Sequence, residues 1–204
     1  VYAFSMPLTV DSTGKKLGKS YGNALWLDSN KTSSYEMYQY ILNFEDSMVE
    51  DYLKRYTFLS KDEIEKIMTE QNEAPHLRIA QKKLAEEIIT FIHGKEGLES
   101  AIRITNALFS GNIKDLTVEE IEMAFSDLTP YEINSDINIV ELLVDSGICK
   151  SKREAREFIG NGSIALNGEK MTDLEFNITK SVAIGHKYVV IRRGKKKYYI
   201  IAFK

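Results

Sequence analysis

The sequence has few of the residues that build disulfides and metal sites. Cys149 is the single cysteine among 204 residues, so the chain forms no internal disulfide and no multi-cysteine metal cluster. The three histidines, His76, His93 and His186, lie far apart, which excludes a His-x-x-x-His metal pair on one helix. No apolar run approaches the roughly 18–20 residues of a membrane helix. We therefore expect a cytoplasmic protein that neither spans a membrane nor holds a metal ion of its own.

The first residues show no signal-peptide pattern, and the composition of the chain is not biased. It begins at Val1, without the basic stretch and apolar core of a signal peptide, and we interpret it as a piece of a longer protein. Hydrophobic residues make up 43% and charged residues 28%, which is ordinary for a soluble globular chain. Collagen-like, low-complexity and wholly disordered proteins are excluded, and 204 residues predict one to two domains.

Negative charge is scarce in the last quarter of the chain. From Lys150 onward there are thirteen Lys and Arg residues against five Asp and Glu, whereas residues 1–149 hold fourteen against twenty-five. An acidic body followed by a basic module favours a polyanionic partner for the module, such as RNA or DNA. The alternative is that the basic clusters are only solvated surface.

Residues 31–130 have the hydrophobic spacing of helices. Three Ser/Thr-x-x-Glu capping boxes predict helix starts: Ser33 with Glu36, Ser60 with Glu63, and Thr117 with Glu120. Asp46 is expected to cap a further helix. Pro75 predicts the first turn of a long helix that Gly94 closes, and another helix follows over residues 97–109. We interpret residues 31–130 as a helical domain.

The pattern changes after residue 130. Residues 131–136 are polar and turn-forming without a clear period, which predicts a linker. Two short helices are then expected, over residues 138–145 and 151–160.

The end of the chain has the pattern of strands. A strand from residue 164 enters an Asn167-Gly168 hairpin turn, and a last hairpin runs over residues 188–203 with its turn at residues 193–195. We therefore predict a small α+β domain over residues 137–204. The predicted fold class is mostly α with this α+β domain at the C-terminus.

A glycine- and lysine-rich loop begins at Gly14. It has three residues between Gly14 and Gly18, where a Walker A loop needs four, and no strand-to-helix pattern surrounds it. What remains is two ammonium groups, Lys16 and Lys19, beside the hydroxyl of Ser20, on a backbone that glycine lets approach a ligand closely. Such a loop suits a polyphosphate, and the alternative is a solvated turn.

The run Lys16-Leu17-Gly18-Lys19-Ser20 is similar to the K-M-S-K-S signature of class I aminoacyl-tRNA synthetases. It has the K-x-G-K-S/T form of the bacterial-type tyrosyl-tRNA synthetases, with Leu17 and Gly18 in place of Met and Ser. The resemblance continues in order and without large gaps, at residues 6–8, 11–14, 24–28, 31–36, 56–60, 107–111 and 191–199. It is therefore far more specific than a five-residue motif.

The resemblance implies a reaction and its substrates. A tyrosyl-tRNA synthetase joins tyrosine to ATP, releases pyrophosphate and passes the tyrosyl group to the 3′ end of tRNA(Tyr). By position, Lys16 and Lys19 are the catalytic residues that stabilise charge on the departing pyrophosphate. The ATP phosphates are bound by Lys16, Gly18, Lys19 and Ser20, and Mg²⁺ accompanies the ATP without a protein metal site. Residues 1–30 are then the end of a Rossmann-type catalytic domain.

The resemblance also implies what this chain lacks. The family's other signature needs two histidines three residues apart, and no such pair exists among the 204 residues. The tyrosine pocket is expected upstream of Val1, so we expect the chain alone to be inactive. Full-length enzymes of the family are homodimers through the nucleotide-binding domain, and we expect the isolated chain to be monomeric. An organelle copy whose targeting segment has been removed has the same features as a cytoplasmic one.

A cationic helix carries the nucleic-acid prediction. Lys152, Arg153 and Arg156 share one face of the helix over residues 151–160, opposite an apolar face that packs inward. The pattern over residues 151–168 resembles the S4-like RNA-binding module that ends bacterial-type tyrosyl-tRNA synthetases. A second set of cations lies on the last hairpin: Arg192, Arg193, Lys195, Lys196 and Lys197. The resemblance implies that the module holds tRNA. We expect it to bind mostly through phosphates and shape, because cationic side chains without a base-reading loop carry little sequence information, and the hairpin set has the alternative of a solvated tip.

Two other functions stay open on the sequence. A non-catalytic RNA-binding protein of the ribosomal S4-like type explains the module, but it has no use for the loop of Lys16 and Lys19. A phosphate-loop nucleotidase is disfavoured by the loop spacing.

The helical domain over residues 31–130 resembles the anticodon-binding domain of the family. Its tyrosines have two interpretations, as stacking platforms for bases or as core.

Overall fold

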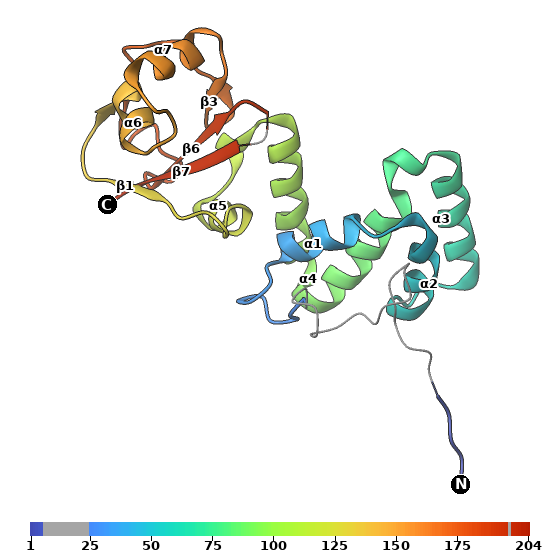
Figure 1. Cartoon of the computed structure of the whole chain (residues 1–204). Coiled ribbons are helices and arrows are strands. Elements are labelled where there is room, and N and C mark those ends of the chain that lie inside the picture. The colour runs from blue at the N-terminus through green and yellow to red at the C-terminus, as the bar shows by residue number, and fades with distance from the viewer. Residues whose placement is uncertain (6–24, 196) are drawn as a thin grey trace. The chain divides into compact units, whose positions relative to one another are not determined.

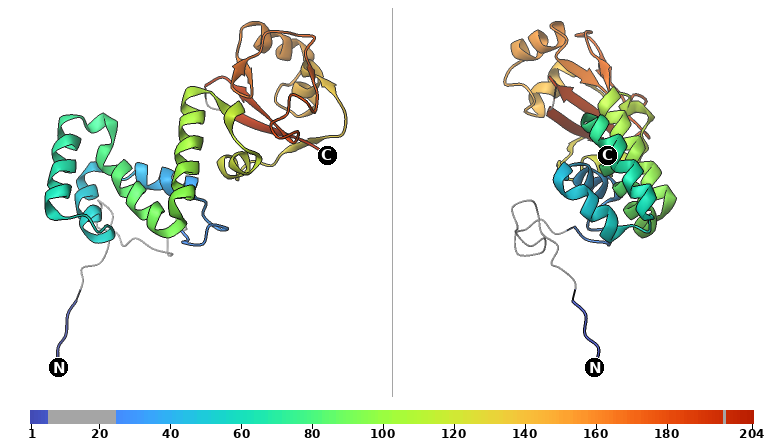
Figure 2. Two further views of the ribbon diagram at one scale, coloured as in Figure 1. Left: turned by 180° about the vertical axis from the view of Figure 1, so that it is seen from behind. Right: turned by 90° about the vertical axis from the view of Figure 1, so that its right-hand side faces the viewer.

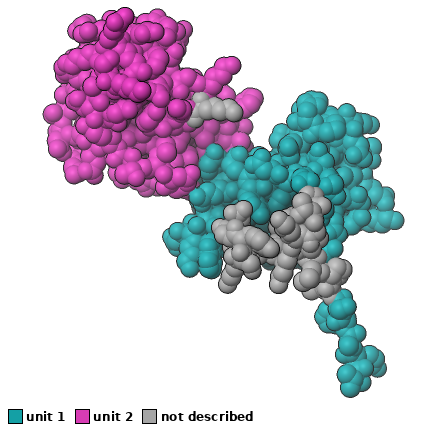
Figure 3. Space-filling view, in the orientation of Figure 1, with its two compact units in different colours: residues 1–101 teal, residues 102–204 magenta. Residues whose placement is uncertain are grey.

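The computed structural model describes residues 1–5, 25–195 and 197–204. These divide into two compact units, Val1–Ala101 and Ile102–Lys204 (Figures 1 and 3). The first unit is helical, and the second adds a five-stranded sheet and a two-stranded ribbon to its helices. The chain is therefore mostly helical with a small sheet region, as predicted. No helix of the described residues combines the length and the apolar character needed to cross a membrane.

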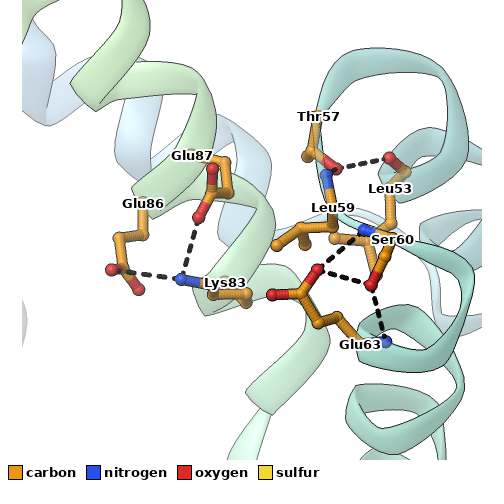
Figure 4. Close-up of polar contacts among 8 residues, drawn as sticks. All are labelled: Leu53, Thr57, Leu59, Ser60, Glu63, Lys83, Glu86 and Glu87. Atoms are coloured by element: carbon orange, nitrogen blue, oxygen red, sulfur yellow. Dashed lines mark hydrogen bonds and ion pairs between the residues drawn. The ribbon is translucent and has the colours of Figure 1, made fainter.

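Helices α1 to α3 and the start of α4 build the first unit. Their bounds are α1 Ser34–Leu42, α2 Asp46–Tyr56, α3 Lys61–Glu73, the 3₁₀ helix η2 Pro75–Leu77, and α4 Ile79–Ser110. The capping boxes predicted at Ser33 and Ser60 are confirmed. Figure 4 shows the second box, in which the hydroxyl and the backbone N–H of Ser60 both donate to Glu63 Oε2. These bonds to Ser60 hold the pKa of Glu63 below its usual value.

Asp46 does not cap α2. It is the first residue of that helix, and the preceding residue Glu45 takes the cap position without a side-chain capping bond. The Asp46 carboxylate instead accepts hydrogen bonds from Gln71 at 2.9 Å and Gln81 at 2.6 Å, and these two side chains are 2% and 0% exposed. The predicted cap was wrong because the buried amides of Gln71 in α3 and Gln81 in α4 bind the carboxylate that a local cap would use.

The core of the first unit lies between the apolar faces of these helices. Its fully buried side chains include Val49, Leu53, Leu84 and Ile89. Tyr38 and Tyr52 belong to the same core, with 7% and 2% of their surface exposed, so the core interpretation holds for these two tyrosines. Tyr56 is 47% exposed.

Helix α4 starts later than predicted and is interrupted where predicted. Pro75 opens η2, and Arg78, with φ 52°, separates η2 from α4. The Arg78 guanidinium donates to the carbonyl oxygens of Leu42 and Phe44, which holds this left-handed position in place. At Gly94 the backbone has φ 75° and ψ 178°, so the helical pattern is broken there, as the glycine predicts.

The second unit begins within α4 and has a helical and a sheet part. Its further helices are η3 Ile113–Asp115, α5 Val118–Ala124, α6 Ile139–Asp145 and α7 Lys152–Gly160. Its strands are β1 Tyr131–Ile133, β2 Ile137–Asn138, β3 Ile164–Leu166, β4 Glu169–Lys170, β5 Asn177–Ile178, β6 Tyr188–Arg193 and β7 Lys197–Phe203. The capping box at Thr117, the two short helices and the last hairpin are confirmed.

The five-stranded sheet has the strand order β1-β7-β6-β3-β4. Strand β1 pairs with β7 in parallel, and the other neighbouring strands are antiparallel. Strands β2 and β5 form a separate antiparallel pair. Helices α6 and α7 pack against one face of the sheet, where Leu142, Ile159 and Ile191 are fully buried (Figures 1 and 2).

The predicted Asn167-Gly168 turn is confirmed, with φ values of 48° and 93°. The Asn167 side chain accepts a hydrogen bond from the Val190 N–H and donates one to the Val182 carbonyl, each at 2.9 Å. A Cβ atom on Gly168 would lie 1.6 Å from the carbonyl oxygen of Gly111. The turn therefore serves the hairpin and also lets its backbone approach the end of α4.

Residues 131–136, expected as a linker, contain strand β1 at the edge of the sheet. Helix α5 also belongs to the same unit as the sheet. Glu122 on this helix accepts hydrogen bonds from Lys187 and Tyr188, each at 2.8 Å. The domain boundaries drawn from the sequence, with domains over residues 1–30, 31–130 and 137–204, stay a prediction.

Candidate nucleic-acid interface

The predicted phosphate loop lies outside the described residues. Lys16, Gly18, Lys19 and Ser20 all fall within residues 6–24, and Lys196 of the hairpin set is also outside the described part. The catalytic, ATP-binding and RNA-binding assignments to these residues stay predictions. The described part of the candidate interface consists of α7 and the last hairpin.

Helix α7 carries its cations on an exposed face. Ser151 caps the helix by accepting a hydrogen bond from the N–H three residues on, at 3.2 Å, which fixes the turn that holds Lys152 and Arg153. Ile159 on the opposite face is fully buried in the core, whereas Lys152, Arg153 and Arg156 are exposed. The predicted division into an apolar and a cationic face is confirmed. Burial of the apolar face fixes the helix, so the backbone of the three cationic residues is held in place.

The three cations of α7 differ in their partners. Lys152 Nζ lies 2.7 Å from Glu141 Oε1, and this ion pair joins the first turn of α7 to the first turn of α6. Within residues 25–195 and 197–204, Arg153 and Arg156 form neither an ion pair nor a side-chain hydrogen bond. Their two guanidinium groups, three residues apart on one helix, are available for bidentate bonds to phosphate oxygens.

An open groove lies beside the cationic face. It is lined by Lys152 and Arg156 from α7, Asn138 and Glu141 from the start of α6, and Glu175 and Asn177 near β5. Asn138 is already engaged, because its Oδ1 accepts from the Val140 N–H at 2.9 Å and its Nδ2 donates to the Leu174 carbonyl at 3.1 Å. The groove therefore has cations, carboxylates and amides within one short stretch of surface.

The two arginines of β6 point to opposite faces of the sheet, because successive strand residues alternate. Arg193 Nη1 donates a hydrogen bond to the carbonyl oxygen of Ile148, in the connection between α6 and α7. The Arg193 guanidinium lies 5.7 Å from the ring centroid of Phe158 and 5.8 Å from that of Tyr199. Arg192 has a buried Nε atom without a hydrogen-bond partner in the described part of the chain. Both side chains are half-buried.

The remaining hairpin cations lie at the exposed tip. Lys195 and Lys197 are exposed, and Gly194 between β6 and β7 has φ 66°. The Gly194 N–H donates to the Ser163 carbonyl at 2.8 Å, and Ser163 follows the last residue of α7 by three positions. The tip therefore lies next to the C-terminal end of α7. The sequence grouped five hairpin cations, and the structure separates the half-buried pair from the exposed ones.

His93 has a structural place in the first unit. Its Nδ1 lies 2.8 Å from Ser34 Oγ, and its Nε2 lies 3.0 Å from the Leu27 carbonyl oxygen. Because a carbonyl only accepts, Nε2 carries the proton and the Ser34 hydroxyl donates to Nδ1. Both ring nitrogens are thus used within the fold. The described residues contain no group of three or more His, Cys, Asp and Glu side chains that could hold a metal ion.

Sequence reasoning missed the partner of Lys152. Glu141 follows Asn138 by three positions, which is the spacing of a capping box, and Asn138 does cap α6. The Glu141 carboxylate turns to Lys152 instead, eleven residues away along the chain. No local pattern predicts this contact, because it depends on how α6 and α7 pack together.

Known proteins resemble this chain along its whole length. The family described as "tRNA synthetases class I (W and Y)" matches residues 1–110, and "Tyrosine--tRNA ligase SYY-like C-terminal domain" matches residues 120–201. The chain is 48% identical over 205 residues to a tyrosine–tRNA ligase of Streptococcus agalactiae serotype Ia, and 46% identical over 204 residues to one of Staphylococcus carnosus. Each alignment covers 100% of this chain and 49% of the relative, so the chain spans about half the length of these relatives.

Among solved structures, the solution structure of a tyrosyl-tRNA synthetase C-terminal domain is 48% identical to the matching part of the chain. That match covers 48% of this chain and 100% of the domain, with a TM-score of 0.39.

Proposed function

The chain belongs to the class I tRNA synthetases of the tyrosine and tryptophan family, and from this premise we propose that it is the tRNA-binding portion of a tyrosine–tRNA ligase. The observation that carries the proposal is the order of the two family matches, over residues 1–110 and 120–201. A free-standing RNA-binding protein of the ribosomal S4-like type would account for the second match alone. The first match favours a ligase.

The proposed reaction activates tyrosine with ATP and passes the tyrosyl group to tRNA(Tyr). Lys16 and Lys19 are proposed to stabilise the charge that develops as pyrophosphate leaves, with the Gly18 backbone and Ser20 also binding the ATP phosphates. Interactions that strengthen as charge develops act on the rate more than on substrate affinity. Mg²⁺ belongs to the substrate in this proposal, held by the ATP phosphates.

In this proposal, tyrosine is bound by residues outside this chain. The 204 residues contain no pair of histidines three positions apart, which is the other signature expected from the resemblance. We therefore propose that the isolated chain does not activate tyrosine, that it is a monomer, and that the full-length ligase is a dimer. The single cysteine suits a reducing compartment, for which we propose the cytoplasm.

In this proposal, tRNA binds mainly to the exposed face of α7. Arg153 and Arg156 are exposed and available, and the fixed helix holds them at a spacing suited to consecutive phosphates. Lys152, Lys195 and Lys197 extend the same positive surface, and Lys196 is proposed to join them. The half-buried arginines of β6 are proposed to support this surface from behind. Contacts of this kind position the RNA backbone and carry little sequence information.

Binding of labelled tRNA(Tyr) to the 204-residue chain at increasing salt tests the proposal. Replacing Arg153 and Arg156 with alanine should lower the affinity and reduce the slope of log K against log salt by about one unit or less per arginine. The matched control is Lys180→Ala, which removes an exposed cation of the same unit outside α7 and the hairpin tip. A double variant with unchanged affinity and slope would contradict the proposal.

A further inference from the structure

Glu141 and Lys152 form an exposed ion pair at the N-terminal end of the cationic face of α7. The Nζ to Oε1 distance is 2.7 Å, and the two side chains are 51% and 54% exposed, respectively. We infer that Glu141 competes with RNA phosphate for Lys152, so that this carboxylate lowers the affinity of the α7 surface for nucleic acid. The inference rests on the proposed function, and it assigns to Glu141 a role in setting how tightly tRNA is held.

The backbone at both residues of the pair is fixed, because both residues stand in capped first turns. Asn138 caps α6 through the Val140 N–H, and Ser151 caps α7 through the Glu154 N–H. The two helices are also held together through the core, where Leu142 of α6 is fully buried. The carboxylate and the ammonium group therefore meet without any further rearrangement of the backbone.

The ion pair is not needed to hold α6 and α7 together. Exposed pairs of this kind contribute little to folding stability, because water screens both charges and two long side chains lose conformational freedom. Lys152 also stands at the first position of α7, where the helix dipole favours negative charge. A lysine at this place and this exposure suits binding an external anion better than stabilising its own helix. The pairing lowers the pKa of Glu141, so this carboxylate is charged at neutral pH.

The groove beside the pair shows why the competition is direct. Lys152 and Arg156 line the same groove as Glu141. Lys152 and Arg156 are four residues apart on α7, which is about 6 Å along the helix axis. A phosphate bound by Arg156 leaves the ion pair intact. An RNA backbone that continues along α7 reaches Lys152 only where it displaces the Glu141 carboxylate. Glu141 thus lowers the affinity for RNA that follows the whole cationic face, whereas a phosphate bound at Arg156 alone does not meet this competition.

Glu175 provides a matched control for this inference. It lines the same groove and is exposed, and it forms no ion pair within the described residues. Glu175→Gln and Glu141→Gln each remove one negative charge from the groove and keep the shape of the side chain. A difference between the two variants therefore reports the pairing with Lys152 and not the general loss of repulsion.

The test is a double-mutant cycle on the 204-residue chain with labelled tRNA(Tyr) at moderate salt. Glu141→Gln should tighten binding about two- to five-fold, the range expected for releasing an exposed ion pair. Glu175→Gln should tighten it less. In a Lys152→Gln background, Glu141→Gln should give no more tightening than Glu175→Gln. Thermal unfolding of each variant checks that the fold is retained.

Two outcomes would overturn the inference while leaving the proposed function in place. Weaker binding by Glu141→Gln would mean that the carboxylate positions Lys152 for RNA. An equal gain from Glu141→Gln with and without Lys152 would mean that the carboxylate acts only through general repulsion. A wild-type chain that fails to bind tRNA(Tyr) would instead contradict the proposed function itself.

Discussion

The guanidinium of Arg193 donates a hydrogen bond to the carbonyl oxygen of Ile148. This contact ties strand β6 to the connection that leads into α7, three residues before the cap at Ser151. Phe158 of α7 lies against the same guanidinium. Arg193, one of the cations expected to touch RNA, therefore supports the helix that presents the other cations.

Arg193→Ala should destabilise the chain by about 2 kcal/mol, because a hydrogen bond to a charged group and the packing against Phe158 are lost together. Its effect on tRNA binding should be an affinity loss with little change in the salt slope, since no phosphate contact is removed. Thermal unfolding and salt-dependent tRNA binding measure the two effects. Lys195→Ala is the contrasting variant, with an unchanged melting temperature and a smaller slope. A reduced slope and normal stability for Arg193→Ala would show a phosphate contact instead.

At Gly168 the hairpin backbone closely approaches the end of α4. Gly168→Ala combines a φ of 93° with a Cβ atom 1.6 Å from the Gly111 carbonyl oxygen, so the backbone must move. We expect a loss of more than about 2 kcal/mol in the free energy of unfolding. Gly147→Ala is the matched control, because its φ is 72° and its Cβ would meet nothing within 4 Å. Equal costs for the two variants in chemical denaturation would show that the close approach contributes nothing.

Glu122 makes part of the stability of the second unit depend on pH. Hydrogen bonds from Lys187 and Tyr188 hold the pKa of Glu122 below its usual value of 4.5. A carboxyl group with a lowered pKa in the folded state stabilises the fold at neutral pH, and this stabilisation is lost as pH falls below about 4.5 through the folded-state pKa. Glu122→Gln should therefore be less stable at pH 7 and lose less stability between pH 6 and 3. Melting temperatures across that range measure the difference.

Glu175→Gln is the control for the pH prediction, because it removes an exposed carboxylate of the same unit that forms no ion pair within the described residues. Its melting temperatures should follow those of the wild type at each pH. A pH profile of Glu122→Gln that runs parallel to the wild type would contradict the assigned role of Glu122.

Local signals in the sequence were sufficient for the helix starts and tight turns. The boxes at Ser33, Ser60 and Thr117 and the turn at Asn167-Gly168 depend on residues within four positions of one another, and the structure confirms them. The amphipathic division of α7 is equally local. These features follow from short-range hydrogen bonding and from the period of the apolar residues.

Contacts between segments distant along the chain could not be predicted from the sequence. Strand β1 exists because β7, about seventy residues later, offers a parallel edge to the segment expected as a linker. Asp46 has the residue type of a cap, but the distant side chains of Gln71 and Gln81 take its carboxylate. Strand alternation predicts that Arg192 and Arg193 point to opposite faces of the sheet. Only the structure shows that Arg193 is the one on the face of the α6–α7 connection.

The most direct test of the account is the rate of tyrosyl transfer to tRNA(Tyr) by the full-length protein that contains this chain. The variant carries alanine at Lys16 and Lys19, and the wild type is measured beside it. The account predicts a fall in kcat of at least about 100-fold with a much smaller change in the KM for ATP, as expected when groups that stabilise the transition state are removed. An undiminished kcat in the double variant would contradict it.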